Sequence, residues 1–236
     1  MMAIMDPKIS IVTVCFNAVK TIEQTIISIV NQSYNNMEYI VIDGQSTDGT
    51  IEIIKKYDKN ISSWISEPDK GIYDAMNKAL EMATGDFLIF LGADDHLLSF
   101  DTISNVVENI KDLNYVYYGD VYRNSRNDLY RGKFNKYLLA CENICHQAIF
   151  YPKDVYKKYM YDLNFPVFAD YAYNLKIWRI CKFVYIPVCI TYFNCMGASG
   201  KGDDEKYGEE MMEVIKNNLG FLSFLLKKVY LLLKRR

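Results

Sequence analysis

The chain has 236 residues, of which 50% are hydrophobic and 24% are charged, and its formal net charge at pH 7 is −2. This composition is typical of a folded globular protein, and it excludes a disordered chain and a general nucleic-acid binder. The length fits one large α/β domain better than two ordinary domains.

The first half of the chain alternates short apolar runs with helical periodicity. Residues 9–15 are β-branched and apolar, as in a strand buried on both faces, and apolar residues then recur at helical spacing from residue 22 to residue 30. Thr21 with Gln24 predicts a capping box at the start of that helix. The alternation continues with predicted strands at 37–42, 61–65 and 87–91, a helix opening near 46–50, and a helix through 72–82. It implies a mostly parallel sheet that binds ligands at the carboxyl ends of its strands.

The second half of the chain is less regular, and we expect mixed strands and helices there. It contains a tyrosine-rich stretch at 115–137, a strand-like run at 148–151 and a predicted helix at about 171–182. A charged helix is predicted at about 205–217. The composition then changes abruptly at 221–236, where five basic residues interrupt an apolar segment.

Acidic side chains follow three of the predicted strands. Asp43 follows the second strand, residues 67–69 follow the third, and Asp94 with Asp95 follows the fourth. Because the carboxyl ends of parallel strands meet at one edge of a sheet, these carboxylates should converge on one crevice, where their mutual repulsion favours a bound cation. Mg²⁺ and Mn²⁺ prefer oxygen ligands and leave positions for phosphate oxygens, so Asp94 and Asp95 are the candidate metal ligands.

Turn chemistry is the alternative for any of these clusters taken singly, since Asp in a turn often bonds its own backbone. Asp48 lies in a Ser-Thr-Asp-Gly-Thr run with the composition of a helix start, so we interpret it mainly as a cap. Asp43 differs because it directly follows an apolar strand, which is more often a ligand position in this architecture.

Five ordered motifs make the first hundred residues similar to the bacterial family 2 glycosyltransferases, which are inverting enzymes with the GT-A fold. The close match covers residues 8–96. The motifs are ISIVTVCFN at 9–17, SIVNQSY at 28–34, DGQSTDGT at 43–50, DKGIYDAMNK at 69–78, and TGD at 84–86 leading to DD at 94–95.

The resemblance implies an α/β fold of the GT-A type, with a mostly parallel Rossmann-like sheet flanked by helices. A single glycosyltransferase domain is expected at 1–218, with a donor half at about 8–96 and a mixed acceptor half at about 97–200. A basic amphipathic tail at 219–236 follows. The processive relatives carry a Gln-x-x-Arg-Trp segment and several membrane spans; neither is present here, which implies transfer of one sugar per encounter.

The resemblance also implies roles for individual residues of the donor half. They are Thr13 and Phe16 bordering the nucleobase, Asp43 accepting from a base N–H, Asp69 and Lys70 lining the nucleotide, and Asp94 meeting the metal and the diphosphate. Gly92 stands where the metal motif of the family usually begins with Asp or Asn. Fewer protein ligands are therefore expected, with phosphate oxygens completing the shell of Mn²⁺ or Mg²⁺.

Inversion requires a base for the acceptor hydroxyl, and the family places it on a carboxylate at the start of a helix in the later half. Asp170 matches that position imperfectly; an N-cap role is the alternative, and the two can coexist. His146 lies in a segment that resembles one facing the donor phosphates or the acceptor, and a core or surface histidine is the alternative. Because His96 is the other histidine, no dyad is expected for His146.

The tyrosine-rich stretch offers candidates for sugar contacts. Asp120 follows a predicted strand, where it is a candidate ligand for a sugar hydroxyl, with turn chemistry as the alternative. The nearby tyrosines either stack on sugars or cover a half-buried sheet; they are Tyr117, Tyr118, Tyr122 and Tyr130.

The expected function is transfer of a hexose or N-acetylhexosamine from a nucleotide-sugar donor, with uridine the favoured base. The expected acceptor is a glycan, free or linked to undecaprenyl diphosphate, in the synthesis of a surface polysaccharide. A sugar nucleotidyltransferase is the nearest alternative, but residues 16–20 contain no glycine to wrap a triphosphate. A third alternative is a non-catalytic carbohydrate-binding protein, favoured by Gly92 and by the imperfect match around Asp170.

The location is inferred from three features of the sequence. Residues 1–8 lack the pattern of a secretory signal, and the six cysteines form no Cys-x-x-Cys pair, which favours reduced thiols. The tail at 221–236 is too short to span a bilayer, which needs about 20 apolar residues, but its apolar and basic side chains favour an anionic membrane surface. We therefore expect a cytoplasmic protein, peripheral on the inner face of the cell membrane. A tail helix packed on the catalytic core, with its lysines in water, is the alternative.

Overall fold

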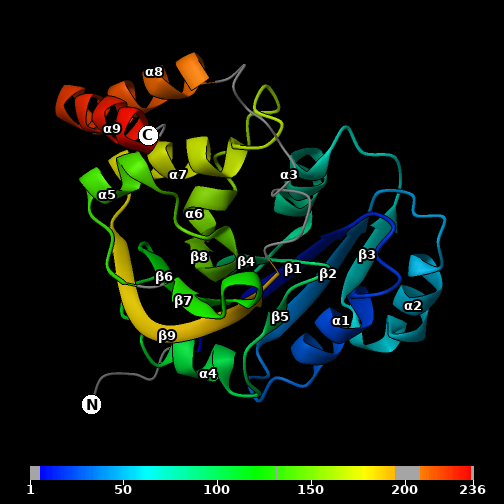
Figure 1. The fold of residues 1–236 in the computed structure, drawn as a ribbon. Helices are drawn as coiled ribbons and strands as arrows, with labels where there is room; N and C mark the ends of the chain where they lie inside the picture. Colours follow the sequence, from blue (N-terminus) through cyan, green and yellow to red (C-terminus); the bar gives the residue numbers. More distant parts are fainter. Residues whose placement is uncertain (1–5, 131, 195–207, 235–236) are drawn as a thin grey trace, which may run out of the picture.

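The computed structural model describes residues 6–130, 132–194 and 208–234. Cys195, the start of the helix predicted from residue 205, and Arg235 and Arg236 of the tail lie outside the described residues. The described residues form one curled sheet with helices on both faces (Figure 1).

The first half of the sheet is parallel, as the alternation of strands and helices predicts. Its strands lie in the order β3-β2-β1-β4. They are β1 (Ile9–Cys15), β2 (Met37–Asp43), β3 (Ser63–Ser66) and β4 (Phe87–Gly92). The helices that connect them are α1 (Ile22–Val30), α2 (Thr50–Lys56) and α3 (Ile72–Met82). β3 begins later than predicted because the short 3-10 helix η1 (Asp58–Asn60) precedes it.

The second half adds mixed strands, also as expected. β8 (Ile149–Pro152) runs antiparallel to β4 and to β6 (Val116–Arg123), and β9 (Phe183–Phe193) runs parallel to β6. Two short strands pair at the edges, β5 (His96–Leu97) with β9 and β7 (Asp128–Tyr130) with β6. The remaining helical elements are α4 (Thr102–Val107), η2 (Asn124–Arg126), α5 (Lys136–Cys141), η3 (His146–Ala148), α6 (Lys153–Tyr156), α7 (Ala169–Ile180), α8 (Gly208–Leu219) and α9 (Phe221–Lys234).

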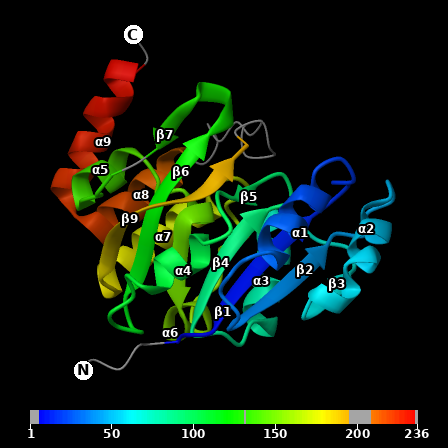
Figure 2. The same cartoon turned by 90° about the horizontal axis from the view of Figure 1, so that it is seen from below.

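Two hydrophobic clusters sandwich the sheet. One contains residues of α3, α5, α7 and α8, and the other contains residues of α1, α2 and α4; Figures 1 and 2 show these helices on opposite faces. Tyr117 and Tyr118 are fully buried, and each hydroxyl accepts a hydrogen bond from a backbone N–H. These two tyrosines therefore build the core of the sheet and are not exposed for stacking on a sugar.

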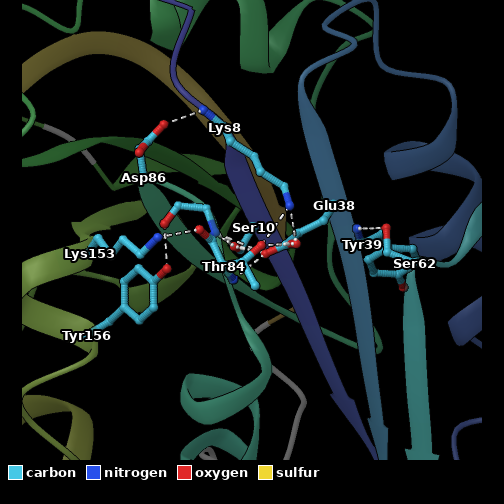
Figure 3. Close-up of polar contacts among 10 residues, drawn as sticks. Lys8, Ser10, Glu38, Tyr39, Ser62, Thr84, Asp86, Lys153 and Tyr156 are labelled. Carbon is cyan, nitrogen blue, oxygen red and sulfur yellow. Dashed lines mark hydrogen bonds and ion pairs between the residues drawn. The ribbon is translucent and has the colours of Figure 1, made fainter.

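The amino ends of β1, β2 and β4 are tied together by one carboxylate (Figure 3). Glu38 accepts hydrogen bonds from Ser10 Oγ at 2.5 Å, from Lys8 Nζ at 2.6 Å and from the backbone of the Thr84–Gly85 turn at 2.6 and 3.1 Å. Burial raises the pKa of Glu38, but the bonds from Lys8, Ser10 and Thr84 outweigh burial and lower it to about 2. The three strands are thus held in register, and their carboxyl ends lie side by side at the opposite edge.

The predicted capping box at α1 is wrong. The Thr21 side chain makes no cap hydrogen bond to the helix, and its hydroxyl lies 3.4 Å from the Ala18 carbonyl. The same carbonyl accepts bonds from the backbone of Thr21 and Ile22, each at 3.0 Å. A turn closed at Ala18 therefore directs the Thr21 side chain backward, away from Gln24.

The last helix, α9, is packed on one side and apolar on the other. It contacts α5 and α8, with Ser223 buried and Lys227 half-buried on that side. The opposite side exposes a leucine-rich stripe, made of Leu222, Leu225, Leu226, Val229, Leu232 and Leu233. Within the described ranges, no helix is both long enough and apolar enough to cross a membrane.

Candidate active site

The carboxyl ends of the parallel strands open into a pocket of about 870 Å³. Such a volume suits a ligand the size of a nucleotide sugar. We call it the donor pocket. The first half of the chain forms most of its wall: the end of β1 and the loop that follows it (14–21), Gly44 and Asp48 after β2, Asp69 and Gly71 after β3, the start of α3 with Ile72, and residues 90–95 at the end of β4 and beyond. The second half contributes His146 and Gln147 of η3, and Phe193 and Asn194 at the end of β9.

Asp94 and Asp95 lie together in this pocket but differ in their surroundings. Asp95 is only 2% exposed; its Oδ1 accepts from the backbone N–H of Asn194 at 2.8 Å and its Oδ2 from Gln147 Nε2 at 3.1 Å. Burial, which these bonds only partly offset, raises the pKa of Asp95 to about 6. Asp94 accepts one bond, from Asn194 Nδ2 at 3.2 Å, and burial raises its pKa as well. Two carboxylates that are costly to ionise side by side would be stabilised by a cation.

The residues present fit a cation that takes some of its ligands from the protein and the others from a bound substrate. A Cβ at Gly92 would lie 2.7 Å from Asp95 Oδ2 and 3.2 Å from Asp94 Oδ1, so a side chain at that position would displace the Asp95 carboxylate. Across the part of the chain that the structure describes, no group of three or more His, Cys, Asp and Glu residues could hold a metal. Mg²⁺ and Mn²⁺ are commonly held by one or two carboxylates together with substrate phosphates. Asp94 and Asp95 would supply the two carboxylates.

The loops at the mouth of the donor pocket hold one another. Asn17, with a positive φ of 50°, donates from its backbone to Ser46 Oγ at 2.7 Å and accepts from the Thr47 N–H through Oδ1 at 2.9 Å. Asp48 accepts from Thr50 and, at 3.1 Å, from the Val19 N–H, so it helps to begin α2 although Gly49 occupies the N-cap position. These bonds leave Phe16 66% exposed at the pocket wall.

Thr13 and Asp43 lie deeper than the other predicted donor residues. Both are fully buried. The Tyr39 hydroxyl donates to Thr13 Oγ1 at 3.1 Å, and the pocket wall is formed by the next residue, Val14. Asp43 accepts from the Ser46 N–H at 2.9 Å, Ser66 Oγ at 2.7 Å and Cys15 Sγ at 3.5 Å. A contact between Asp43 and a nucleobase stays a prediction.

Lys78 is a cation of this site that sequence reasoning did not single out. Its Nζ lies 2.5 Å from Asp69 Oδ1 and 2.9 Å from Glu67 Oε1, so it holds the loop after β3. Lys70, the predicted nucleotide contact, is exposed, and its backbone N–H donates to Asp74 Oδ2 at 3.0 Å. The sequence does carry a signal for Lys78. It lies four residues after Asp74, which places the two side chains on the same face of the helix, and Asp74 is bonded to the loop.

A second pocket of about 240 Å³ adjoins the first and shares His146, Gln147 and Phe193 with it. We call it the acceptor-side pocket. Asp170 lines it from the first turn of α7. The helix begins at Ala169 with Phe168 at the N-cap, so the N-cap alternative for Asp170 is wrong; the extra helical residue places Asp170 inside the turn.

The Asp170 carboxylate is surrounded by hydrogen-bond donors. Oδ1 accepts from the Tyr171 N–H at 2.8 Å and lies 3.0 Å from the Tyr73 hydroxyl. Oδ2 accepts from Asn143 Nδ2 at 2.8 Å and lies 3.2 Å from His146 Nδ1. The expectation that His146 has no dyad is therefore wrong: its partner is a carboxylate 24 residues away along the chain, and not a second histidine.

Asp120 is engaged elsewhere in the fold. It is 8% exposed, and it accepts from the Gly132 N–H at 2.9 Å and from the Tyr185 hydroxyl at 2.9 Å. Asp120 lies inside β6 and not after it, and its two partners are 12 and 65 residues away along the chain, so turn chemistry does not describe these contacts. A contact between Asp120 and a sugar hydroxyl stays a prediction. Of the tyrosines, Tyr130 lines the acceptor-side pocket, and Tyr122 stacks on Tyr192 at a ring-centroid distance of 5.4 Å.

Sequence reasoning missed the amides that orient the carboxylates. Gln147 and Asn194 hold Asp95, and Asn143 holds Asp170. Gln147 directly follows His146, and Asn194 directly follows β9, but neither position has a local pattern that marks it as part of a site.

The sheet topology and the carboxylate-lined pocket at its parallel edge define a glycosyltransferase of the GT-A type. The chain belongs to glycosyl transferase family 2, whose family model matches residues 10–175. It is 34% identical over 200 residues to the PGL/p-HBAD biosynthesis glycosyltransferase of Mycobacterium bovis (strain BCG / Pasteur 1173P2), an alignment that covers 81% of this chain and 78% of the relative. It is also 42% identical over 94 residues to an uncharacterized glycosyltransferase of Haemophilus influenzae, covering 39% of this chain and 38% of that one.

Solved structures show the same fold at low sequence identity. The S. aureus TarS structure matches with a TM-score of 0.71 at 18% identity, over 89% of this chain and 39% of that chain. TarS 1–349 in complex with UDP-GlcNAc matches with a TM-score of 0.68 at 18% identity, covering 89% and 66%. The mannosyltransferase PcManGT from Pyrobaculum calidifontis, in complex with GDP-Man and Mn²⁺, matches with a TM-score of 0.64 at 18% identity, covering 78% and 56%. This chain thus spans about two fifths of TarS, and the likeness extends to the fold alone.

Proposed function

We propose that the protein is an inverting glycosyltransferase that transfers one sugar from a UDP-linked donor to a glycan or lipid-linked glycan in the synthesis of a bacterial surface polysaccharide. The observation that carries the proposal is the pair of adjoining pockets, with Asp94 in one and Asp170 in the other. The UDP-GlcNAc complex of TarS and the naming of a relative for PGL/p-HBAD biosynthesis support the donor and the surface glycan. Family membership sets the nucleotidyltransferase alternative aside.

In the donor pocket, Asp94 would hold a divalent cation, with Asp95 beside it. When bound, the metal neutralises charge on the departing nucleoside diphosphate. The exposed ring of Phe16 would border the nucleobase, and Asp69, held by Lys78, lines the same pocket. Gln147 and Asn194 keep the paired carboxylates in place, so that little reorganisation is needed as the leaving group gains charge.

In the acceptor-side pocket, Asp170 would act as the general base. The acceptor oxygen forms a bond to the anomeric carbon from the side opposite the diphosphate, the bond to the diphosphate oxygen breaks, and the hydroxyl proton passes to Asp170. The contacts with Asn143 and His146 fix the direction of the carboxylate. The Tyr73 hydroxyl lies 3.0 Å from Asp170 Oδ1 and 2.5 Å from the Val167 carbonyl oxygen, so its single proton is shared between these two acceptors. Such orientation matters because small misplacements of a base cost large factors in rate.

We further propose that residues 1–218 form the glycosyltransferase domain and that residues 219–236 form a tail on the inner face of the cell membrane. The apolar stripe of α9 supplies area for the headgroup boundary, and the exposed lysines, Lys228 and Lys234, favour anionic lipid.

The proposal is tested by incubating the full chain with Mn²⁺ and a panel of UDP- and GDP-linked sugars. Nuclear magnetic resonance follows hydrolysis and reports the configuration of the first sugar anomer released, before it equilibrates. We expect hydrolysis of a UDP-sugar with inversion. Release with retained configuration would contradict the mechanism, and no hydrolysis of any donor would favour the non-catalytic alternative.

A further inference from the structure

Lys227 differs from its neighbours in α9 because it faces the body of the protein. Its Nζ donates to the Cys141 carbonyl at 3.0 Å and lies 5.7 Å from the ring centroid of Tyr171. Burial lowers the pKa of Lys227. Lys228, the next residue, is exposed and lies over the Phe224 ring of its own helix. The two adjacent lysines therefore differ in their surroundings: Lys227 contacts α5, and Lys228 is exposed to solvent.

Cys141 ends α5, a helix whose last carbonyls lack partners within the helix. The Tyr171 hydroxyl lies 2.7 Å from both the Leu139 and the Ala140 carbonyl oxygens. Lys227 supplies the donor for the next carbonyl, and a cation at the carboxyl end of a helix also interacts favourably with the helix dipole. The end of α5 is thus held from two sides, by α9 and by the first turn of α7.

The segment that leaves α5 leads directly to the proposed base. Asn143, two residues after Cys141, donates to Asp170 Oδ2 at 2.8 Å. Its own Oδ1 accepts from Asn174 Nδ2 at 2.9 Å, and its carbonyl oxygen lies 2.5 Å from the Tyr130 hydroxyl. A movement of the end of α5 would therefore displace the amide that orients Asp170.

We propose that Lys227 is a positioning residue, which fixes the end of α5 and thereby the Asn143 amide against Asp170, so that the tail helix is part of the acceptor side of the active site. This inference rests on the proposed role of Asp170 as the base. Lys227 lies on the side of α9 opposite the apolar stripe, so its effect on catalysis is separable from any effect on membrane binding.

The test compares Lys227→Met with the matched control Lys228→Met, both in the full chain. Two quantities are measured: the hydrolysis rate of the UDP-sugar that the wild type turns over, and the affinity for UDP with Mn²⁺ by calorimetry. Lys227→Arg, which retains a donor for the carbonyl, tests rescue.

We expect Lys227→Met to lower the hydrolysis rate about tenfold with UDP affinity unchanged, because orientation of the base is lost and the donor pocket is untouched. Lys228→Met should match the wild type, and Lys227→Arg should restore most of the rate. Combining Lys227→Met with Asn143→Ala should cost little more than Asn143→Ala alone.

A wild-type hydrolysis rate in Lys227→Met would overturn the inference. Equal losses of rate and UDP affinity would also overturn it, because they indicate a general loss of structure. If Lys227→Met does not fold, Lys227→Gln takes its place in each comparison. The proposed function fails separately, if Asp170→Asn keeps the wild-type hydrolysis rate.

Discussion

At the scale of single residues, the Asp170 carboxylate has more donors than a helix residue needs. They come from α3, from the loop after α5, from η3 and from α7 itself. The carboxylate oxygens of a surface aspartate in the first turn of a helix would accept hydrogen bonds from the helix backbone and from water. The contacts from Asn143, His146 and the Tyr171 N–H instead hold one orientation of the carboxylate at the acceptor-side pocket, which is what the proposed general base requires.

His146 should matter for catalysis and little for donor binding. We expect His146→Gln to lower the hydrolysis rate of a UDP-sugar by a factor of about 10 to 100, with UDP affinity within a factor of about two, because an orienting contact to the base is weakened. Steady-state kinetics and calorimetry measure the two quantities. His96→Gln is the control, since His96 stacks on Tyr192 at the edge strand β5. Equal losses in the two variants would contradict the role of His146.

At the scale of secondary-structure elements, the parallel strands are fixed at their amino ends and carry the site at their carboxyl ends. Glu38 joins β1, β2 and the turn before β4 through bonds to backbone and side chains (Figure 3). The loops at the other edge are therefore free to be shaped by Asn17, Ser46 and Asp48 without disturbing strand register.

Glu38 should make stability depend on pH in a defined window. Its pKa is about 2 in the fold, below the usual 4.5, so its contribution is present in full above about pH 4.5 and is lost as the pH falls toward 2. After allowance for solvent screening, we expect Glu38→Gln to lower the free energy of unfolding by about 1–2 kcal/mol at pH 7. Urea unfolding at pH 7 and pH 3 measures this. The control is Glu52→Gln at an exposed position of α2.

The expected result is a difference in the free energy of unfolding between wild type and Glu38→Gln that is smaller at pH 3 than at pH 7. At pH 3 the Glu38 carboxyl of the unfolded chain is largely protonated and must release its proton on folding. If the difference in the free energy of unfolding is equal at both pH values, packing and not charge accounts for the lower stability of Glu38→Gln.

The sequence predicts the first half of the fold better than the second for a physical reason. Strands buried on both faces appear as continuous apolar runs, and the carboxylates that follow them meet at one edge. β9 was not predicted, since Pro187 interrupts its apolar pattern and its pairing with β6 shifts register near Asp120. The His146–Asp170 contact joins a short 3-10 helix to a distant helix start, and no local period encodes such a pair.

At the scale of the whole molecule, α9 lies at the outer end of the layer that contains α5, α7 and α8 (Figure 1). One side completes that layer, and the other carries the apolar stripe. With 14 residues, α9 is too short for a stable coiled coil on its own, and the partner that we propose for the stripe is a lipid surface.

The stripe should bind anionic vesicles. We expect the full chain to sediment with vesicles that contain anionic lipid at low salt and to be released at high salt, because lysines supply part of the attraction. Leu225→Ser with Leu232→Ser should remain in the supernatant, while Leu129→Ser, an exposed leucine on β7, should behave as the wild type. Sedimentation of the doubly substituted chain at the wild-type level would show that α9 is not the anchor.

The central claim is that donor binding and proton transfer occupy adjoining pockets, with Asp170 serving only the second. The most direct test is the affinity of Asp170→Asn for UDP with Mn²⁺, measured by calorimetry beside its rate of sugar transfer or hydrolysis. We predict wild-type UDP affinity with the rate lowered at least about a hundredfold, whereas Asp94→Asn should lose the metal-dependent part of the affinity. An Asp170→Asn variant that loses UDP affinity as much as rate would contradict the claim.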